Sequence, residues 1–217
     1  DNTKPASSAV VVTATAVAPG TAYDALTATV TLALVDNDVP AVVFSKTSLT
    51  VTEGGSDDSF DVSLATKPLA DVELLASIPG QLLLIPDSTT LMATWTPDNW
   101  DTVATITVAA SDDLIDEADA DTAIGFTVAA EGDVHYKVIG AMSVDVHIVD
   151  NDVAGVTFDM TTLSMEEGNS GIYQVKLDTQ PTASVTVAIS AAGGAEVGLS
   201  TELLVFSTAN YDSYQSV

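Results

Sequence analysis

The sequence predicts an all-β protein made of tandem antiparallel β-sandwiches of the immunoglobulin-like type. Val and Thr dominate runs in which apolar and polar residues alternate, and no stretch keeps the apolar period of about 3.6 residues that a helix needs. The tetrapeptide Val-Asp-Asn-Asp stands at 35–38 and again at 149–152, 114 residues further on. Each copy ends one strand-like run and precedes another, so we interpret it as a junction between repeated domains.

The composition favours a folded, strongly acidic chain. The 217 residues include 31 Asp and Glu against 5 Lys, which gives a net charge of −26, and 47% of them are hydrophobic. That apolar content is too high for a disordered chain. Five scattered Lys and no Arg form no basic patch, which argues against nucleic-acid binding. The charge instead indicates divalent cations as partners, or solubility in salty surroundings.

The apolar stretches and the absence of Cys narrow the interpretation further. The longest apolar stretch, 74–85, is broken by Pro79-Gly80 and is too short to span a bilayer, so we expect no membrane insertion in this segment. Without Cys there is neither a disulfide nor a thiolate metal site, and the redox compartment stays open.

Residues 1–38 are interpreted as the C-terminal part of a repeat. Two strand-like runs, 10–17 and 28–35, flank the turn Pro19-Gly20-Thr21, and Val30, Leu32 and Leu34 share one face. The strands needed to bury that face are missing from this part, and a two-stranded hairpin alone is marginally stable in water.

Residues 39–152 hold one complete repeat, of a size that suits a seven-stranded sandwich. In the run 60–64, Phe60, Val62 and Leu64 point inward and Asp61 and Ser63 outward. An irregular loop is expected through Pro86-Asp87. The expected strands are 42–51 in one broken strand, 60–64, 72–78, 91–95, 104–108, 124–128 and 144–148.

Residues 153–217 begin the pattern again and supply only its N-terminal part. The matched stretches are 165–168 with 51–54, 173–177 with 60–64, and 206–212 with 95–101. Two interpretations stay open: the segment belongs to a longer tandem array, or the tail of one molecule completes the head of the next by strand donation. The short linkers 39–40 and 153–154 predict a nearly fixed relation between adjacent domains.

The motifs recur in a fixed order: Glu-Gly after a strand, the turn Trp95-Thr-Pro-Asp-Asn-Trp100, an Asp-rich loop at 112–119, and the terminal Asp-Asn-Asp. In this order they resemble the Calx-β family, known from calcium-sensing domains of sodium–calcium exchangers and from long extracellular repeat arrays in adhesion proteins. The resemblance covers nearly the whole chain, and the Trp-Thr-Pro-Asp-Asn-Trp turn looks more like the extracellular arrays.

The resemblance implies that acidic side chains converge at one end of the central sandwich to bind Ca²⁺, a cation that takes six to eight oxygen ligands. Asn151 departs from the three consecutive acids of many family members, and Gly198 falls where Asp87 would align. The candidate ligands are Glu53, Asp87, Asp112, Asp113, Asp116, Asp119, Asp150 and Asp152, with Asp36, Asp38 and Glu167 as the corresponding acids of the flanking repeats. An alternative is that these acids only shape turns and keep the chain soluble. We prefer that alternative for Asp57, Asp58, Asp61, Asp71, Glu73 and Asp145.

Aromatic and histidine residues give little support for an enzyme or a lectin. Trp95, Trp100, Phe206 and Tyr211 are interpreted as anchors of the core, with a glycan-stacking platform as the alternative. His135 and His147 lack a nucleophile in a fixed motif, so no catalytic triad is expected. Paired carboxylates are also the groups that glycosidases use, but these cluster at a seam and not in a cleft.

We therefore expect a calcium-binding structural segment of a long extracellular adhesion or surface-filament protein, without enzymatic activity. Its partners would be neighbouring repeats, other cell-surface proteins or glycans. Two other functions stay open: a calcium sensor of a membrane transporter, and a glycan-binding accessory module of an extracellular enzyme.

Overall fold

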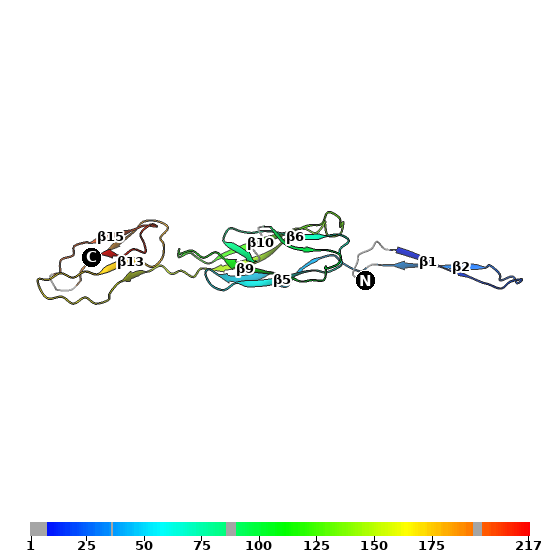
Figure 1. Cartoon of the computed structure of the whole chain (residues 1–217), viewed down its shortest axis with the longest axis horizontal. Helices are drawn as coiled ribbons and strands as arrows, with labels where there is room; N and C mark the ends of the chain where they lie inside the picture. The colour runs from blue at the N-terminus through cyan, green and yellow to red at the C-terminus, as the bar shows by residue number, and fades with distance from the viewer. Residues whose placement is uncertain (1–7, 36, 86–89, 193–196) are drawn as a thin grey trace.

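The computed structural model describes residues 8–35, 37–85, 90–192 and 197–217. Within these ranges the regular elements are all strands. Figure 1 shows a hairpin at one end, a central sandwich, and a smaller β-rich part at the other end. The described residues contain no helix long and apolar enough to cross a membrane. The all-β prediction is confirmed.

The central sandwich consists of two sheets that face one another. The five-stranded sheet has the order β4-β11-β10-β6-β8, and the four-stranded sheet has the order β3-β5-β9-β7. All pairs are antiparallel except β4 with β11. The strands are β3 (Val42–Phe44), β4 (Ser48–Thr52), β5 (Asp58–Leu64), β6 (Val72–Ser77), β7 (Leu82–Ile85), β8 (Leu91–Trp95), β9 (Ala104–Ala110), β10 (Ala120–Ala129) and β11 (Met142–Val149).

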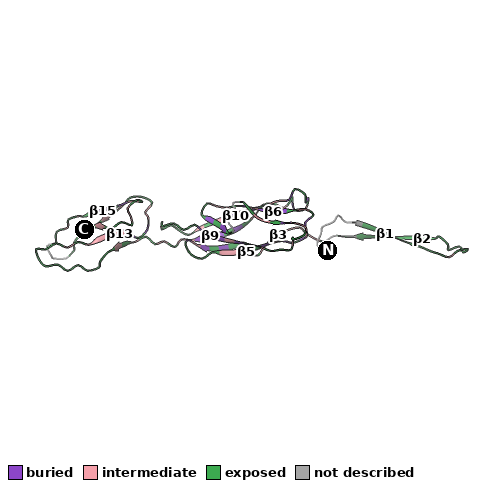
Figure 2. Cartoon of the chain, in the orientation of Figure 1, coloured by how far each residue is buried: buried purple, intermediate pink, exposed green. Residues whose placement is uncertain are grey.

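The core lies between the inward faces of these two sheets. Phe44 and Phe60, from the four-stranded sheet, contact Phe126 of β10, with ring centroids 5.2 and 6.0 Å apart. The alternation in 60–64 is confirmed, since Phe60, Val62 and Leu64 are buried. Purple, buried strands in Figure 2 are concentrated in this part of the chain.

The central sandwich differs from the sequence prediction in two places. No strand is expected from the sequence at 82–85, but these residues form β7 and pair with β9, with Leu82 and Leu84 buried and Leu83 and Ile85 exposed. A run of four apolar residues has no visible period, so the sheet alone assigns its faces. The single broken strand expected over 42–51 is two strands, β3 and β4, in different sheets.

The N-terminal hairpin pairs β1 (Ser8–Thr15) with β2 (Thr27–Leu34). Val10 lies opposite Leu32 and Val12 opposite Val30, so these four residues share one face. All four are exposed, because no described strand covers them. The described parts of β1 and β2 are green, that is exposed, in Figure 2.

The C-terminal part contains two small sheets. One has the order β12 (Val156–Phe158), β13 (Gln174–Leu177), β16 (Gln215–Ser216), and the other pairs β14 (Val185–Ala188) with β15 (Leu203–Phe206). Val175, Leu177, Leu204, Phe206 and Val217 form a core of its own.

Candidate metal site

Three acidic segments meet at the end of the sandwich where β4 and β11 finish. These strands run parallel with Thr52 opposite Val149, and the Glu53 amide donates to the Val149 carbonyl at 3.1 Å. The β10 strand begins beside Ile148. Parallel strands end on the same side, so Glu53, the loop 111–119 and the segment 150–154 share that end.

Backbone amides of one segment bond to carboxylates of another. The Glu117 amide donates to Asp150 Oδ2 at 2.8 Å, and the Asp150 amide donates to Asp119 Oδ1 at 3.1 Å. The Asp152 amide donates to Asp150 Oδ1 at 3.2 Å. These bonds hold the loop 111–119 against the residues that follow β11.

Asn151 and Gly54 fix the approach of the acidic loop to Glu53. The Asn151 Nδ2 donates to the Glu53 carbonyl at 2.7 Å and to Asp112 Oδ1 at 3.3 Å. Gly54 has a φ of 54°, and a Cβ there would lie 2.8 Å from Asp112 Cγ and 2.9 Å from Asn151 Nδ2. Gly54 therefore serves both the left-handed backbone and the close approach. Asn151, which appeared only to interrupt the acids, is a donor that joins two of them.

Two carboxylates of this end sit where negative charge is unfavourable. Glu53 is 6% exposed, and its burial, followed by the charges of Asp113 and Asp150, raises its pKa. The pKa of Asp152 is also raised, by burial and then by Asp150 and Asp112. Its Oδ2 is buried without a hydrogen-bond partner in the described structure. Loss of solvation and like charges both favour the protonated acid, and a bound cation would oppose both.

The structure gathers most, but not all, of the predicted ligands. Glu53, Asp112, Asp113, Asp116, Asp119, Asp150 and Asp152 lie at this end. Asp38 precedes β3 at the opposite end of the sandwich, and Glu167 is exposed in the C-terminal part. Asp36 and Asp87 lie outside the described residues. In the described ranges no three Asp, Glu or His side chains form a group that could already hold a metal ion, so the acids share a surface and its field without a preformed ligand shell.

The sequence prediction omitted Glu117 from the acids of this end. Glu117 donates its amide to Asp150, and its charge contributes to the raised pKa of Glu53. It stands inside the Asp-rich loop 112–119, so the run of acids was the signal that could have identified it.

The same loop also contacts the C-terminal part of the chain. The Gln180 amide donates to the Leu114 carbonyl at 2.6 Å, and the Ala154 amide donates to Asp116 Oδ2 at 2.8 Å. A groove of about 470 Å³ lies beside these contacts, lined by Ile115, Asp116 and Pro181 among others. The acidic loop therefore forms part of the junction between the central sandwich and the C-terminal part.

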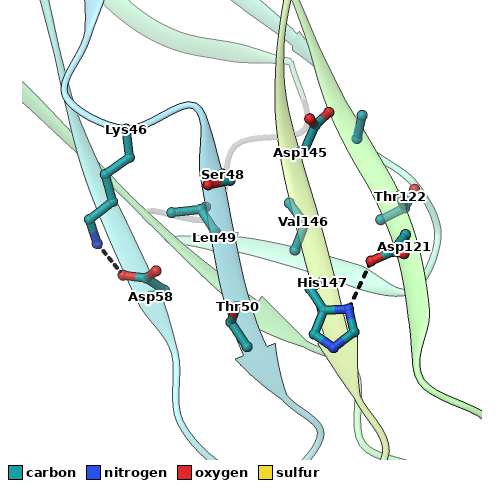
Figure 3. Close-up of a pocket in the computed structure, with 11 residues that line it drawn as sticks. Lys46, Ser48, Leu49, Thr50, Asp58, Asp121, Thr122, Asp145, Val146 and His147 are labelled. Atoms are coloured by element: carbon teal, nitrogen blue, oxygen red, sulfur yellow. Dashed lines mark hydrogen bonds and ion pairs between the residues drawn. The ribbon is translucent and has the colours of Figure 1, made fainter.

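A second groove crosses the outer face of β4, β11 and β10, with a volume of about 950 Å³. Figure 3 shows His147 bonded through Nδ1 to Asp121 Oδ1, at 2.8 Å, and Lys46 bonded to Asp58, at 2.5 Å. The side chains joined by dashed lines are therefore engaged in local hydrogen bonds. Among the described residues that line this groove, no Ser or Thr hydroxyl is hydrogen-bonded to His147, so the groove shows no pair of nucleophile and base.

The aromatic residues support the core interpretation. Trp95 and Phe206 are 1% and 0% exposed, and the Trp95 Nε1 donates to the Thr102 carbonyl at 2.9 Å. Trp100 and Tyr211 are half-buried against the two cores. These rings are anchors, as predicted, and they do not form an exposed glycan-stacking platform.

No protein-family model matches the sequence, and no curated protein matches it. Partial structural similarity is found to domains 4 and 5 of the S-layer protein SbsC (16% identity, TM-score 0.38, 66% of this chain and 58% of that chain). It is also found to the periplasmic chaperone SfaE (8%, 0.35, 64% and 94%) and to CBD12 from CALX1.2 (17%, 0.32, 67% and 59%). The chain spans 58% of the SbsC chain. These similarities are distant, so the β-sandwich assignment rests on the strand pairing described above.

Proposed function

We propose that this chain is a structural segment of an extracellular adhesion or surface filament built from Calx-β-like repeats, in which Ca²⁺ stiffens the junction between the central repeat and the C-terminal one. The observation that carries the proposal is the acidic loop 111–119, which bonds to the segment after β11 and also to Gln180 of the next repeat. A cation held by this loop would act on both repeats.

The donor set at the junction fits a hard cation. Carboxylate oxygens are the ligands that Ca²⁺ prefers, and the buried, unpartnered Oδ2 of Asp152 is an oxygen of this kind. Bound Ca²⁺ would supply positive charge that offsets the mutual repulsion of the acids. Glu53, Asp150 and Asp152 would contribute from the sandwich, and Asp112, Asp113, Asp116 and Asp119 from the loop. The loop acids would transmit the effect to the third repeat through the contacts of Leu114 and Asp116.

The partners in this proposal are neighbouring repeats and other components of a cell surface. The role is mechanical and not enzymatic. A glycan-binding module is disfavoured because the four aromatic residues are buried or half-buried. A transporter sensor is disfavoured by the serial arrangement of repeats, which suits an array.

Calcium titration by calorimetry tests this function, with Asp152→Asn and Asp145→Asn as variants. Both remove one acid, but Asp145 lies on the exposed face of β11, away from the junction. We expect wild type and Asp145→Asn to bind Ca²⁺ with a Kd on the order of 10⁻⁴–10⁻³ M, the range of extracellular modules, and Asp152→Asn to bind at least several-fold more weakly. Equal affinities for all three proteins would contradict the assigned site.

Small-angle scattering of the same proteins measures the stiffening. With Ca²⁺ the wild type should give a larger radius of gyration and more weight at long interatomic distances than with chelator, because the junction no longer bends. Superimposable curves in Ca²⁺ and chelator would reject the mechanical role even if the ion binds.

A further inference from the structure

Among the described residues, the C-terminal part has no strands in the place that the β10–β11 hairpin occupies in the central sandwich. In the central repeat that hairpin lies between β4 and β6. The corresponding segments of the C-terminal part are 162–166 and β14. Among the described residues, 162–166 forms no strand and β14 pairs with β15 alone. Leu163 and Met165 are 40% and 50% exposed, whereas their counterparts Leu49 and Val51 are 3% and 0% exposed.

The remaining strands of the C-terminal part already have the geometry of the central repeat. Val185 pairs with Phe206 as Val72 pairs with Trp95. A cleft of about 690 Å³ is lined by Leu163, Met165, Tyr173 and Val217, among others. An apolar surface of this kind gains stability when another apolar face covers it.

The N-terminal hairpin has the register of the hairpin that is needed. Ser8 lies opposite Leu34 as Ala120 lies opposite Ile148, and Leu34 and Ile148 each stand directly before a Val-Asp-Asn-Asp junction. Val30 and Leu32 correspond to Val144 and Val146, which are 0% and 1% exposed in the central core. In the hairpin they are 61% and 49% exposed. The apolar face of the hairpin therefore has the residue pattern of a core-forming face, but no described strand covers it.

A tyrosine–threonine contact of the central sandwich gives an independent correspondence between the hairpin and the C-terminal part. The Tyr136 hydroxyl, in the loop after β10, donates to the Thr66 carbonyl at 2.7 Å. Thr179 occupies the place of Thr66 in the C-terminal part, two residues after Leu177 as Thr66 is two after Leu64, and it is buried. Tyr23 lies in the loop between β1 and β2 and is 69% exposed. The hairpin thus carries the tyrosine, and the C-terminal part carries the threonine.

We propose that the β1–β2 hairpin of one copy of this chain completes residues 153–217 of a second copy. Within one chain these parts lie at opposite ends of the central sandwich (Figure 1), so the contact joins two copies head to tail. By the central repeat's pairing, β1 lies beside β14, and β2 runs parallel to 162–166 with Leu32 opposite Leu163. A head-to-tail contact of this kind repeats indefinitely and produces filaments.

Light scattering coupled to size exclusion tests the contact, in chelator so that the result is independent of the calcium proposal. Wild type should form species at multiples of 22.2 kDa that grow with concentration. Val12→Asp, on the apolar face of the hairpin, should be monomeric. Val11→Asp is the matched control, since it adds the same charge on the opposite face of β1 and should assemble as wild type does.

A variant of the receiving part distinguishes this contact from pairing between two hairpins. Leu163→Asp should also be monomeric alone. An equal mixture of Leu163→Asp and Val12→Asp should give a dimer of limited size, because one supplies an intact hairpin and the other an intact C-terminal part. Monomeric wild type at all concentrations would overturn the proposal. So would a Leu163→Asp variant that assembles like wild type, or a mixture that stays monomeric.

The absence of Cys makes the register directly testable. Ala33 of β2 should lie opposite Ser164 of the second copy, as His147 lies opposite Thr50. A mixture of Ala33→Cys and Ser164→Cys chains should therefore form a disulfide-linked dimer on mild oxidation. The control pairs Ala33→Cys with Thr162→Cys, two residues away or about 6.6 Å along the strand, and should crosslink at least several-fold less. Equal crosslinking of both pairs would refute the register.

Discussion

The central sandwich and the C-terminal part contain similar strand-forming sequences, at 48–54 and 162–168, that adopt different structures. Leu49 and Val51 lie on β4, buried and paired with β11, whereas the equivalent Leu163 and Met165 are exposed in a segment without regular structure. The two segments have similar alternation and the same Glu-Gly ending. What differs is the neighbour, since β11 supplies both hydrogen bonds and apolar cover to β4. An edge segment becomes a strand here only when its partner is present.

The largest expected effect compares the two buried aromatic anchors. Trp95→Ala should destabilise the central sandwich by about 3–5 kcal/mol, the usual cost of removing a buried aromatic side chain. Phe206→Ala should abolish the packing of the C-terminal part but leave the central unfolding transition in place. Urea denaturation followed by circular dichroism measures both. If Phe206→Ala shifted the central transition as much as Trp95→Ala, the two repeats would not be separate cores.

The next effect concerns Asp133, which lies in the loop between β10 and β11 and is 1% exposed. It accepts hydrogen bonds from the amides of Leu69 at 2.6 Å, His135 at 2.8 Å and Tyr136 at 3.1 Å. Asp133→Ala should cost about 2–4 kcal/mol, because three amides lose a charged acceptor. Asp24, in the exposed loop of the N-terminal hairpin, is the matched control, and Asp24→Ala should leave the central transition unchanged.

Asp133 should also make the central repeat sensitive to acid. Burial alone would raise its pKa, but the three amides outweigh burial and hold the pKa below its ordinary value. Its stabilising effect is therefore complete above the unfolded-state pKa of about 3.9 and is lost as the pH falls through the lower folded-state value. Thermal unfolding between neutral and strongly acidic pH should show a smaller acid-induced loss in Asp133→Ala than in wild type. An identical pH dependence would contradict this role.

The smallest effect compares the two acids of the Glu-Gly motif. Burial and neighbouring charges raise the pKa of Glu53, so its ionised form destabilises the folded state at neutral pH. Without divalent cations, Glu53→Gln should raise the melting temperature by about 1–3 °C. In wild type, stability should likewise increase as the pH falls through the raised pKa. Glu167→Gln, at the exposed counterpart, should change neither quantity.

The opposite change in the melting temperature of Glu53→Gln would also be informative. A lower melting temperature for Glu53→Gln in chelator would show that the ionised carboxylate is already compensated without a cation. Differential scanning calorimetry of the two variants, with and without Ca²⁺, separates these outcomes. The proposed site also predicts that the Ca²⁺-induced rise in melting temperature is smaller in Glu53→Gln than in Glu167→Gln.

Much of the candidate site followed from the order of residues along the chain. The loop 112–119 and the acids after β11 were identified because acids concentrate there, and seven of the predicted ligands do share one end of the sandwich. The burial of Glu53, the bridging role of Asn151 and the contact of Leu114 with Gln180 depend on how β4, β11 and the C-terminal part meet. Sequence spacing alone does not contain those distances.

The sequence by itself determined the all-β class and the inward faces of strands such as 60–64, because alternation of apolar and polar residues is a local property with a period of two. Only the tertiary structure decided that 82–85 is a strand, that β3 and β4 separate into two sheets, and that 162–166 stays irregular. The physical reason is that a strand requires hydrogen bonds and apolar cover from residues distant in sequence. Whether those partners are in place is a property of the assembled fold.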